Sequence, residues 1–112
     1  MKYDEIRNYI SEYLEKAKEI LGASYVKAML YGSYARGEAN PGSDIDLIIL
    51  STLSDPEIET VERELYDLSF DFLMDYGIDI SVIVKNSEHF QHWLGVLPFY
   101  DNIQREGVMI GG

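Results

Sequence analysis

Apolar side chains at the start of the chain recur at spacings of three and four residues, as on one face of a helix. The positions that keep this spacing are Ile6, Ile10, Leu14, Ala17 and Leu21. They predict a helix over residues 3–21. Gly22 follows at once and is placed to end it, because glycine readily adopts the left-handed conformation that closes many helices.

Three shorter apolar segments are typical of strands. In residues 25–31, Val26, Ala28 and Leu30 alternate with Lys27 and Met29. Residues 44–50 and 78–84 are rich in β-branched side chains, which favour strands. The sequence therefore predicts strands over 25–31, 44–50 and 78–84.

Helical signals separate and follow these strands. A short helix is expected over 34–39, before Asn40, Pro41 and Gly42. Ser54, Asp55, Pro56 and Glu57 form a helix start, with proline and acid in the first turn. The long helix that begins there should reach about Tyr76 and end at Gly77. A helical turn over 87–93 and a last helix over 98–106 complete the pattern.

The order of these elements predicts an α/β fold, a three-stranded mixed sheet with flanking helices. With 112 residues and no linker or repeat, residues 1–112 are expected to form one domain. No apolar run approaches the roughly 18–20 residues of a membrane span. The first ten residues are charged and lack the apolar core of a signal peptide, and cysteine is absent. We therefore expect a soluble, cytoplasmic protein without a membrane partner.

The charge is uneven along the chain. Residues 1–40 carry six basic and six acidic side chains, whereas residues 41–112 carry three basic and fourteen acidic ones, so the net charge of −11 arises in the second part. Nucleic-acid binding usually requires neutralisation of phosphates by Lys and Arg. Direct binding of nucleic acid is therefore not expected, and a basic protein partner fits better. The alternative is that the acidity only keeps a small domain soluble.

One segment combines a candidate phosphate site with a candidate metal site. Gly32 and Ser33 are followed, after ten residues, by Asp44 and Asp46. A glycine between a strand and a helix lets a phosphate approach free backbone N–H groups, and the Ser33 hydroxyl can donate to the same oxygen. Asp44 and Asp46 lie two apart on one face of a strand, where their carboxylates repel unless a cation such as Mg²⁺ joins them. Both halves together suit a nucleoside triphosphate.

Topology supplies a third carboxylate. The phosphate site ends the first strand and the aspartates begin the second, so they meet only if these strands run antiparallel. A helix of about twenty residues then leads to the third strand, the length of a parallel crossover. This arrangement brings Asp79 beside Asp44 and Asp46. The alternative is that the Gly32–Ser33 pair is a plain turn, Asp44 a cap, and Asp46 and Asp79 exposed charges at strand ends.

The block GSYARGEANPGSDIDLIIL resembles the nucleotidyltransferase superfamily of DNA polymerase beta, and within it the minimal nucleotidyltransferases. The resemblance runs from the first helix to the turn at Gly107. It implies the polymerase beta-like fold, Mg²⁺ as cofactor and ATP as substrate. By position, Gly32 and Ser33 would hold the triphosphate, and Asp44, Asp46 and Asp79 would be the catalytic, metal-binding carboxylates.

Short members of this family resemble antitoxins that pair with HEPN toxins, which are helical ribonucleases. The implied reaction is transfer of AMP from ATP to a tyrosine hydroxyl of the toxin, which would inactivate it within a hetero-oligomer. The acidic part of the chain could meet the basic surface expected of a ribonuclease. Two alternatives remain: modification of a small hydroxylated molecule, and an antitoxin that acts by binding alone.

Other residues allow two interpretations each. Arg36 lies one helical turn after Ser33 and can either reach a phosphate or pair with a nearby acid. Tyr31 and Tyr34 flank the phosphate site and are expected mainly to pack. His89 and His92 have a spacing that a metal site could use, although exposed helical histidines are common. Residues 95–100 are apolar and form either core or a contact patch, and the acidic helix before Gly77 is expected to be solvated.

Overall fold

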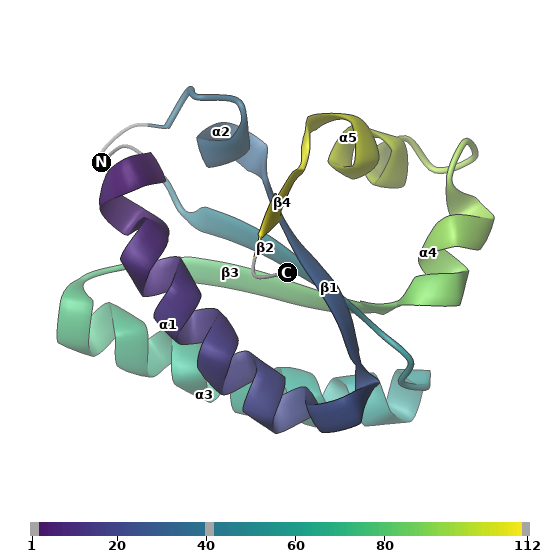
Figure 1. Ribbon diagram of the computed structural model, residues 1–112, viewed down its shortest axis with the longest axis horizontal. Helices are drawn as coiled ribbons and strands as arrows, with labels where there is room; N and C mark the ends of the chain where they lie inside the picture. The colour runs from purple at the N-terminus through teal and green to yellow at the C-terminus, as the bar shows by residue number, and fades with distance from the viewer. Residues whose placement is uncertain (1–2, 40–41, 111–112) are drawn as a thin grey trace.

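The computed structural model describes residues 3–39 and 42–110 (Figure 1). In these residues helices and strands alternate along most of the chain. Their bounds are α1 (Tyr3–Leu21), the 3₁₀ turn η1 (Gly22–Ser24), β1 (Tyr25–Tyr31), α2 (Gly32–Ala35), β2 (Ile45–Ser51), α3 (Asp55–Tyr76), β3 (Ile80–Asn86), α4 (Ser87–Trp93), α5 (Pro98–Glu106) and β4 (Val108–Ile110).

The strands form one mixed sheet in the order β3-β2-β1-β4. β1 and β2 are antiparallel, and β2 and β3 are parallel, as the sequence predicts. β4 is a short fourth strand, antiparallel to β1, which the sequence analysis did not anticipate. Three residues are too few to show an alternating pattern, so only the pairing of Ala28 with Ile110 and of Leu30 with Val108 reveals it.

Helices cover both faces of the sheet (Figure 1). On one face, Leu47 and Ile49 of β2 belong to the same apolar cluster as the buried side chains of α1 and α3. On the other face, Ile48 and Leu50 pack with Phe90 of α4 and with Tyr100 and Ile103 of α5. Since successive side chains of a strand point to opposite faces, β2 is apolar on both sides. Met29 of β1 is buried for the same reason, although the predicted alternation placed it with Lys27.

The ends of α3 match the local signals in the sequence. The Glu57 carboxylate accepts a hydrogen bond from the backbone N–H of Ser54 at 3.1 Å as part of a capping box, and it accepts a further one from the Ser54 hydroxyl at 2.8 Å. Gly77 ends the helix with φ 69°, and its N–H donates to the carbonyl of Leu73. The 22 residues of α3 thus make the crossover between the parallel strands β2 and β3.

Three predicted boundaries differ from the structure near the site. The predicted helix over 34–39 is α2, which starts at Gly32 and stops early because Gly37 is left-handed and Glu38 N–H donates to the carbonyl of Ser33. The predicted strands over 44–50 and 78–84 begin instead at Ile45 and Ile80. Asp44 and Asp79 therefore precede their strands rather than lying inside them.

No helix in residues 3–39 and 42–110 combines the length and the apolar character that crossing a membrane requires.

Candidate active site

Gly32 and Asp46 are in contact where β1 passes into α2. Gly32 has φ 75°, a backbone conformation that residues with a side chain rarely adopt. A Cβ atom at this position would overlap Oδ2 of Asp46. Asp46 itself stands opposite Tyr31 in the antiparallel ladder. The antiparallel pairing thus brings the predicted phosphate site and one predicted metal ligand together.

The parallel pairing adds the other two aspartates. Ile45 pairs with Ile80, and the N–H of Ile45 donates to the carbonyl of Asp79 at 2.8 Å. The carboxyl groups of Asp44 and Asp79 interact closely enough to affect the ionisation of Asp79. The three aspartates are therefore neighbours, as the topology argument predicts.

Burial and neighbouring negative charges both affect the ionisation of the aspartates. Burial raises the pKa of Asp46, the charges of Asp44 and Asp79 raise it further, and the guanidinium of Arg36 lowers it. Burial also raises the pKa of Asp79, followed by its hydrogen bond to Asp44 and the charge of that residue. The ionised forms of Asp46 and Asp79 are thus disfavoured in the absence of a compensating positive charge.

Ser33 and Arg36 lie on and just after the short helix α2. Ser33 is half-buried directly after Gly32. Nε of Arg36 forms an ion pair with Oε2 of Glu38 at 3.1 Å, so one of its two predicted interpretations, pairing with a nearby acid, is present in the structure. The same guanidinium acts electrostatically on Asp46. Contact with a phosphate remains a prediction.

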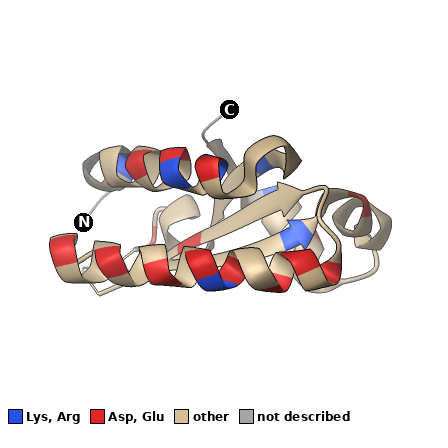
Figure 2. Cartoon of the chain, turned by 90° about the horizontal axis from the view of Figure 1, so that it is seen from below, with Lys and Arg blue, Asp and Glu red and all other residues tan. Residues whose placement is uncertain are grey.

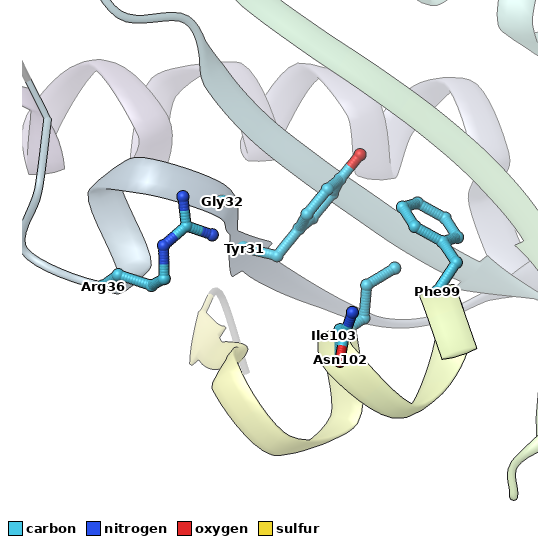
Figure 3. A pocket seen from close by; sticks show the side chains of 6 residues that line it. All are labelled: Tyr31, Gly32, Arg36, Phe99, Asn102 and Ile103. Atoms are coloured by element: carbon cyan, nitrogen blue, oxygen red, sulfur yellow. The ribbon is translucent and has the colours of Figure 1, made fainter.

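A cavity of about 220 Å³ opens beside the predicted phosphate site (Figure 3). Tyr31, Gly32 and Arg36 line it from β1 and α2, whereas Phe99, Asn102 and Ile103 line it from α5. The sequence analysis did not include α5 in the site. These residues lie some seventy positions after Gly32, and no local motif marks them. Only the packing of α5 on the sheet places them there.

A comparison with protein families matches most of the chain. The family model described as nucleotidyltransferase domain matches residues 10–109. The chain belongs to this family. The match contains every residue that the sequence analysis placed in the site, and it extends from α1 into β4.

Curated relatives of this nucleotidyltransferase occur in Methanocaldococcus jannaschii. One, provisionally named a protein adenylyltransferase, is 33% identical over 98 residues, which cover 88% of this chain and 90% of the relative. Another with the same provisional name is 34% identical over 79 residues, or 70% of this chain. The aligned part spans only 54% of the length of that second relative.

Solved structures share the fold of the nucleotidyltransferase. One, described provisionally as a minimal nucleotidyltransferase, has a TM-score of 0.64 and 19% identity, with 98% of this chain and 97% of that chain covered. A toxin–antitoxin structure with AMP-PNP has a TM-score of 0.54 and 17% identity, with 91% and 73% covered. The polymerase beta-like fold class predicted from the sequence is thereby confirmed.

The donors of the nucleotidyltransferase site suit a divalent cation, although they are not yet arranged around one. Carboxylate oxygens are the ligands that Mg²⁺ prefers. Among the described residues, no three acidic or histidine side chains already surround a common point. Burial and the neighbouring carboxylates raise the pKa values of Asp46 and Asp79, and a bound cation would offset both effects. The metal-binding roles of Asp44, Asp46 and Asp79 stay a prediction.

The remaining residues that the sequence singled out either pack against other side chains or lie on the surface. Tyr34 is buried, and Tyr31 contacts Phe99 edge-to-face, so both tyrosines pack as expected. His89 and His92 are exposed on α4 with their rings near Trp93, and they belong to no metal-binding group among the described residues. The apolar segment 95–100 divides, since Tyr100 is core whereas Val96, Leu97 and Phe99 are exposed.

Proposed function

We propose that this nucleotidyltransferase transfers AMP from ATP to a tyrosine hydroxyl of a partner HEPN ribonuclease toxin and thereby acts as its antitoxin. The observation that carries the proposal is the convergence of the Gly32 turn with Asp44, Asp46 and Asp79 at one end of β2. Similarity to two kinds of protein supports a protein as the acceptor of AMP. The M. jannaschii relatives are provisionally named protein adenylyltransferases, and a neighbour in fold was solved as a toxin–antitoxin with AMP-PNP.

Each residue of the site has a task in this reaction. The backbone N–H groups at Gly32 and Ser33 and the Ser33 hydroxyl would bind the phosphate oxygens of ATP, because glycine leaves the backbone open to them. Arg36 would balance part of the triphosphate charge. Asp44, Asp46 and Asp79 would hold Mg²⁺. When bound, that ion neutralises the α-phosphate and the pyrophosphate leaving group.

The chemical step forms one bond and breaks one. The tyrosine oxygen bonds to the α-phosphorus, the bond between the α-phosphorus and the bridging oxygen breaks, and pyrophosphate leaves. The phenol proton, whose ordinary pKa is about 10, passes to the Asp79 carboxylate. The acceptor must come from another molecule, which agrees with an acidic surface that a basic ribonuclease could dock against.

The test is the intact mass of the partner that co-purifies with the protein from its native host. We expect the partner to carry one or more adenylate groups with the wild-type protein and none with the double variant Asp44→Asn, Asp46→Asn. A matched control, Glu15→Gln with Glu19→Gln, removes the same two charges from exposed positions of α1, outside the acidic part of the chain that would meet the toxin, and should leave the modification intact.

Two results would contradict the proposal. An unmodified partner that both forms bind and neutralise equally would make the protein an antitoxin that acts by binding. Rapid adenylylation of a small hydroxylated compound in the absence of any protein acceptor would instead favour a small-molecule substrate. Circular dichroism of the double variant separates loss of chemistry from loss of fold.

A further inference from the structure

The cavity beside Gly32 has the position and size for one part of a nucleotide. Its volume of about 220 Å³ is below the roughly 300–1,000 Å³ of pockets that enclose a whole ligand. Gly32 lines this cavity and also touches Asp46. A triphosphate bound at Gly32 would therefore have its nucleoside end beside the cavity, and α5 forms the opposite wall.

Two aromatic side chains lie at the cavity, and their arrangement lets a base stack on one ring but not between the two rings. The rings of Tyr31 and Phe99 are 5.9 Å apart at an angle of 87°. Because they already touch edge-to-face, no flat ring can be sandwiched between them. Phe99 nevertheless remains 49% exposed, so a large apolar face is available next to the site. Stacking of a base on an aromatic side chain is a common and strong element of nucleotide recognition.

Asn102 presents a hydrogen-bond donor to the cavity. Its Oδ1 accepts a hydrogen bond from Nη2 of Arg105 at 2.7 Å. Arginine can only donate, so this contact assigns the amide orientation: the oxygen faces Arg105 and the amide nitrogen is turned away from it. Figure 3 shows this nitrogen on the side of Tyr31. An acceptor on the edge of a heterocycle is the matching group.

We infer that this cavity is the subsite for the base of the nucleoside triphosphate, with Phe99 as the stacking surface and Asn102 as the donor to a base acceptor. The inference rests on the proposed function for the presence of a nucleotide, but it does not depend on which molecule accepts the AMP. In this arrangement α5 supplies base recognition, whereas the β1–α2 turn supplies phosphate recognition.

The test compares ATP with inorganic tripolyphosphate, which has the phosphates but no base, by calorimetry in the presence of Mg²⁺. Phe99→Ala should weaken ATP binding about tenfold through loss of stacking. Asn102→Leu keeps the branched shape of the side chain and removes the donor, and it should weaken ATP binding about fivefold. Neither variant should change tripolyphosphate binding by more than about twofold. Gln104→Ala, an exposed residue of the same helix, is the matched control and should bind both as the wild type does.

The other outcomes overturn the inference. Equal losses for ATP and tripolyphosphate would place phosphates in the cavity, and unchanged ATP binding in both variants would leave it outside the nucleotide site. Both exchanges concern exposed side chains of α5, and circular dichroism verifies the fold.

Failure of the proposed function is a separate result. If the variants behave as expected while the wild type modifies no protein, the base subsite stands and the acceptor is wrong. If the wild type modifies its partner while the variants bind ATP normally, the acceptor stands and the subsite is wrong. A wild type that binds no ATP overturns both.

Discussion

Gly32 combines two constraints that a side chain would violate. Its φ of 75° strains any other residue, and a Cβ atom would displace the Asp46 carboxylate. Gly32→Ala should therefore lower the free energy of unfolding by about 1 kcal/mol and also reduce adenylate transfer at least tenfold. Urea unfolding and the initial rate of transfer measure the two effects.

Gly77 is the matched control for this exchange. It has nearly the same φ, 69°, but a Cβ there would meet no atom within 4 Å, and it ends α3. Gly77→Ala should cost a similar amount of stability and leave the transfer rate unchanged. Equal activity of the two variants would show that the contact between Gly32 and Asp46 has no role in catalysis.

The site residues differ in how far the sequence could predict them. Gly32, Ser33, Asp44 and Asp46 stand in one short motif, and the strand directions place Asp79 beside them. Phe99 and Asn102 could not be found in this way. The residues around each of them in the sequence predict only a helix and form no motif. Their position at the cavity follows from packing between segments far apart in the chain.

At the scale of elements, one buried hydroxyl adds polar contacts to the apolar packing of α1 on α3. The Tyr13 hydroxyl donates to the carbonyl of Leu65 at 3.1 Å and lies 2.9 Å from Oγ of Ser69. Its ring meets Phe72 edge-to-face at 5.3 Å. Burial is the main cause that raises the pKa of Tyr13 to about 12. The ionised form of Tyr13 is therefore disfavoured where the two helices meet.

This pKa predicts a specific loss of stability in alkali. Between about pH 10 and pH 12 the unfolded chain loses the Tyr13 proton while the folded chain keeps it, so the free energy of unfolding falls as the pH rises. The full shift corresponds to about 2–3 kcal/mol. Tyr13→Phe should be about 1 kcal/mol less stable at pH 7 but decline less steeply in this range. Denaturant unfolding at several pH values measures both slopes, and parallel slopes would contradict the prediction.

The boundaries of elements show what periodicity can and cannot predict. The predicted bounds of three helices are confirmed: residues 3–21, 87–93 and 98–106. The first has a long periodic pattern and is followed by Gly22, and the last begins at Pro98 and is followed by Gly107. The first strand also has its predicted bounds, residues 25–31, whereas the second and third strands begin one and two residues later than predicted. A polar residue just before a strand resembles one just inside it in sequence, and only the ladder that pairs Ile45 with Ile80 separates them.

The whole molecule carries its negative charge unevenly, with a dense line of acids on α3 and mixed charges on α1 (Figure 2). Asp67, Asp71 and Asp75 follow one another at four-residue spacing and are exposed. Like charges at this spacing repel and weaken a helix. A net charge of −11 on a small domain further opposes the compact state. Acidity of this kind therefore costs stability as well as providing solubility.

This loss of stability predicts that Tm depends on the salt concentration and on the charge at position 71. Raising NaCl from about 10 mM to about 500 mM shortens the screening length severalfold and should raise Tm. Asp71→Lys converts two repulsive pairs on α3 into attractive ones, so it should raise Tm by about 2–4 °C at low salt and reduce the salt effect. Asp71→Asn, which only removes the charge, should lie between the two. If α3 also docks the basic toxin, Asp71→Lys will slow association with the toxin while leaving ATP binding unchanged. Unchanged association would assign the acidity of α3 to solubility alone.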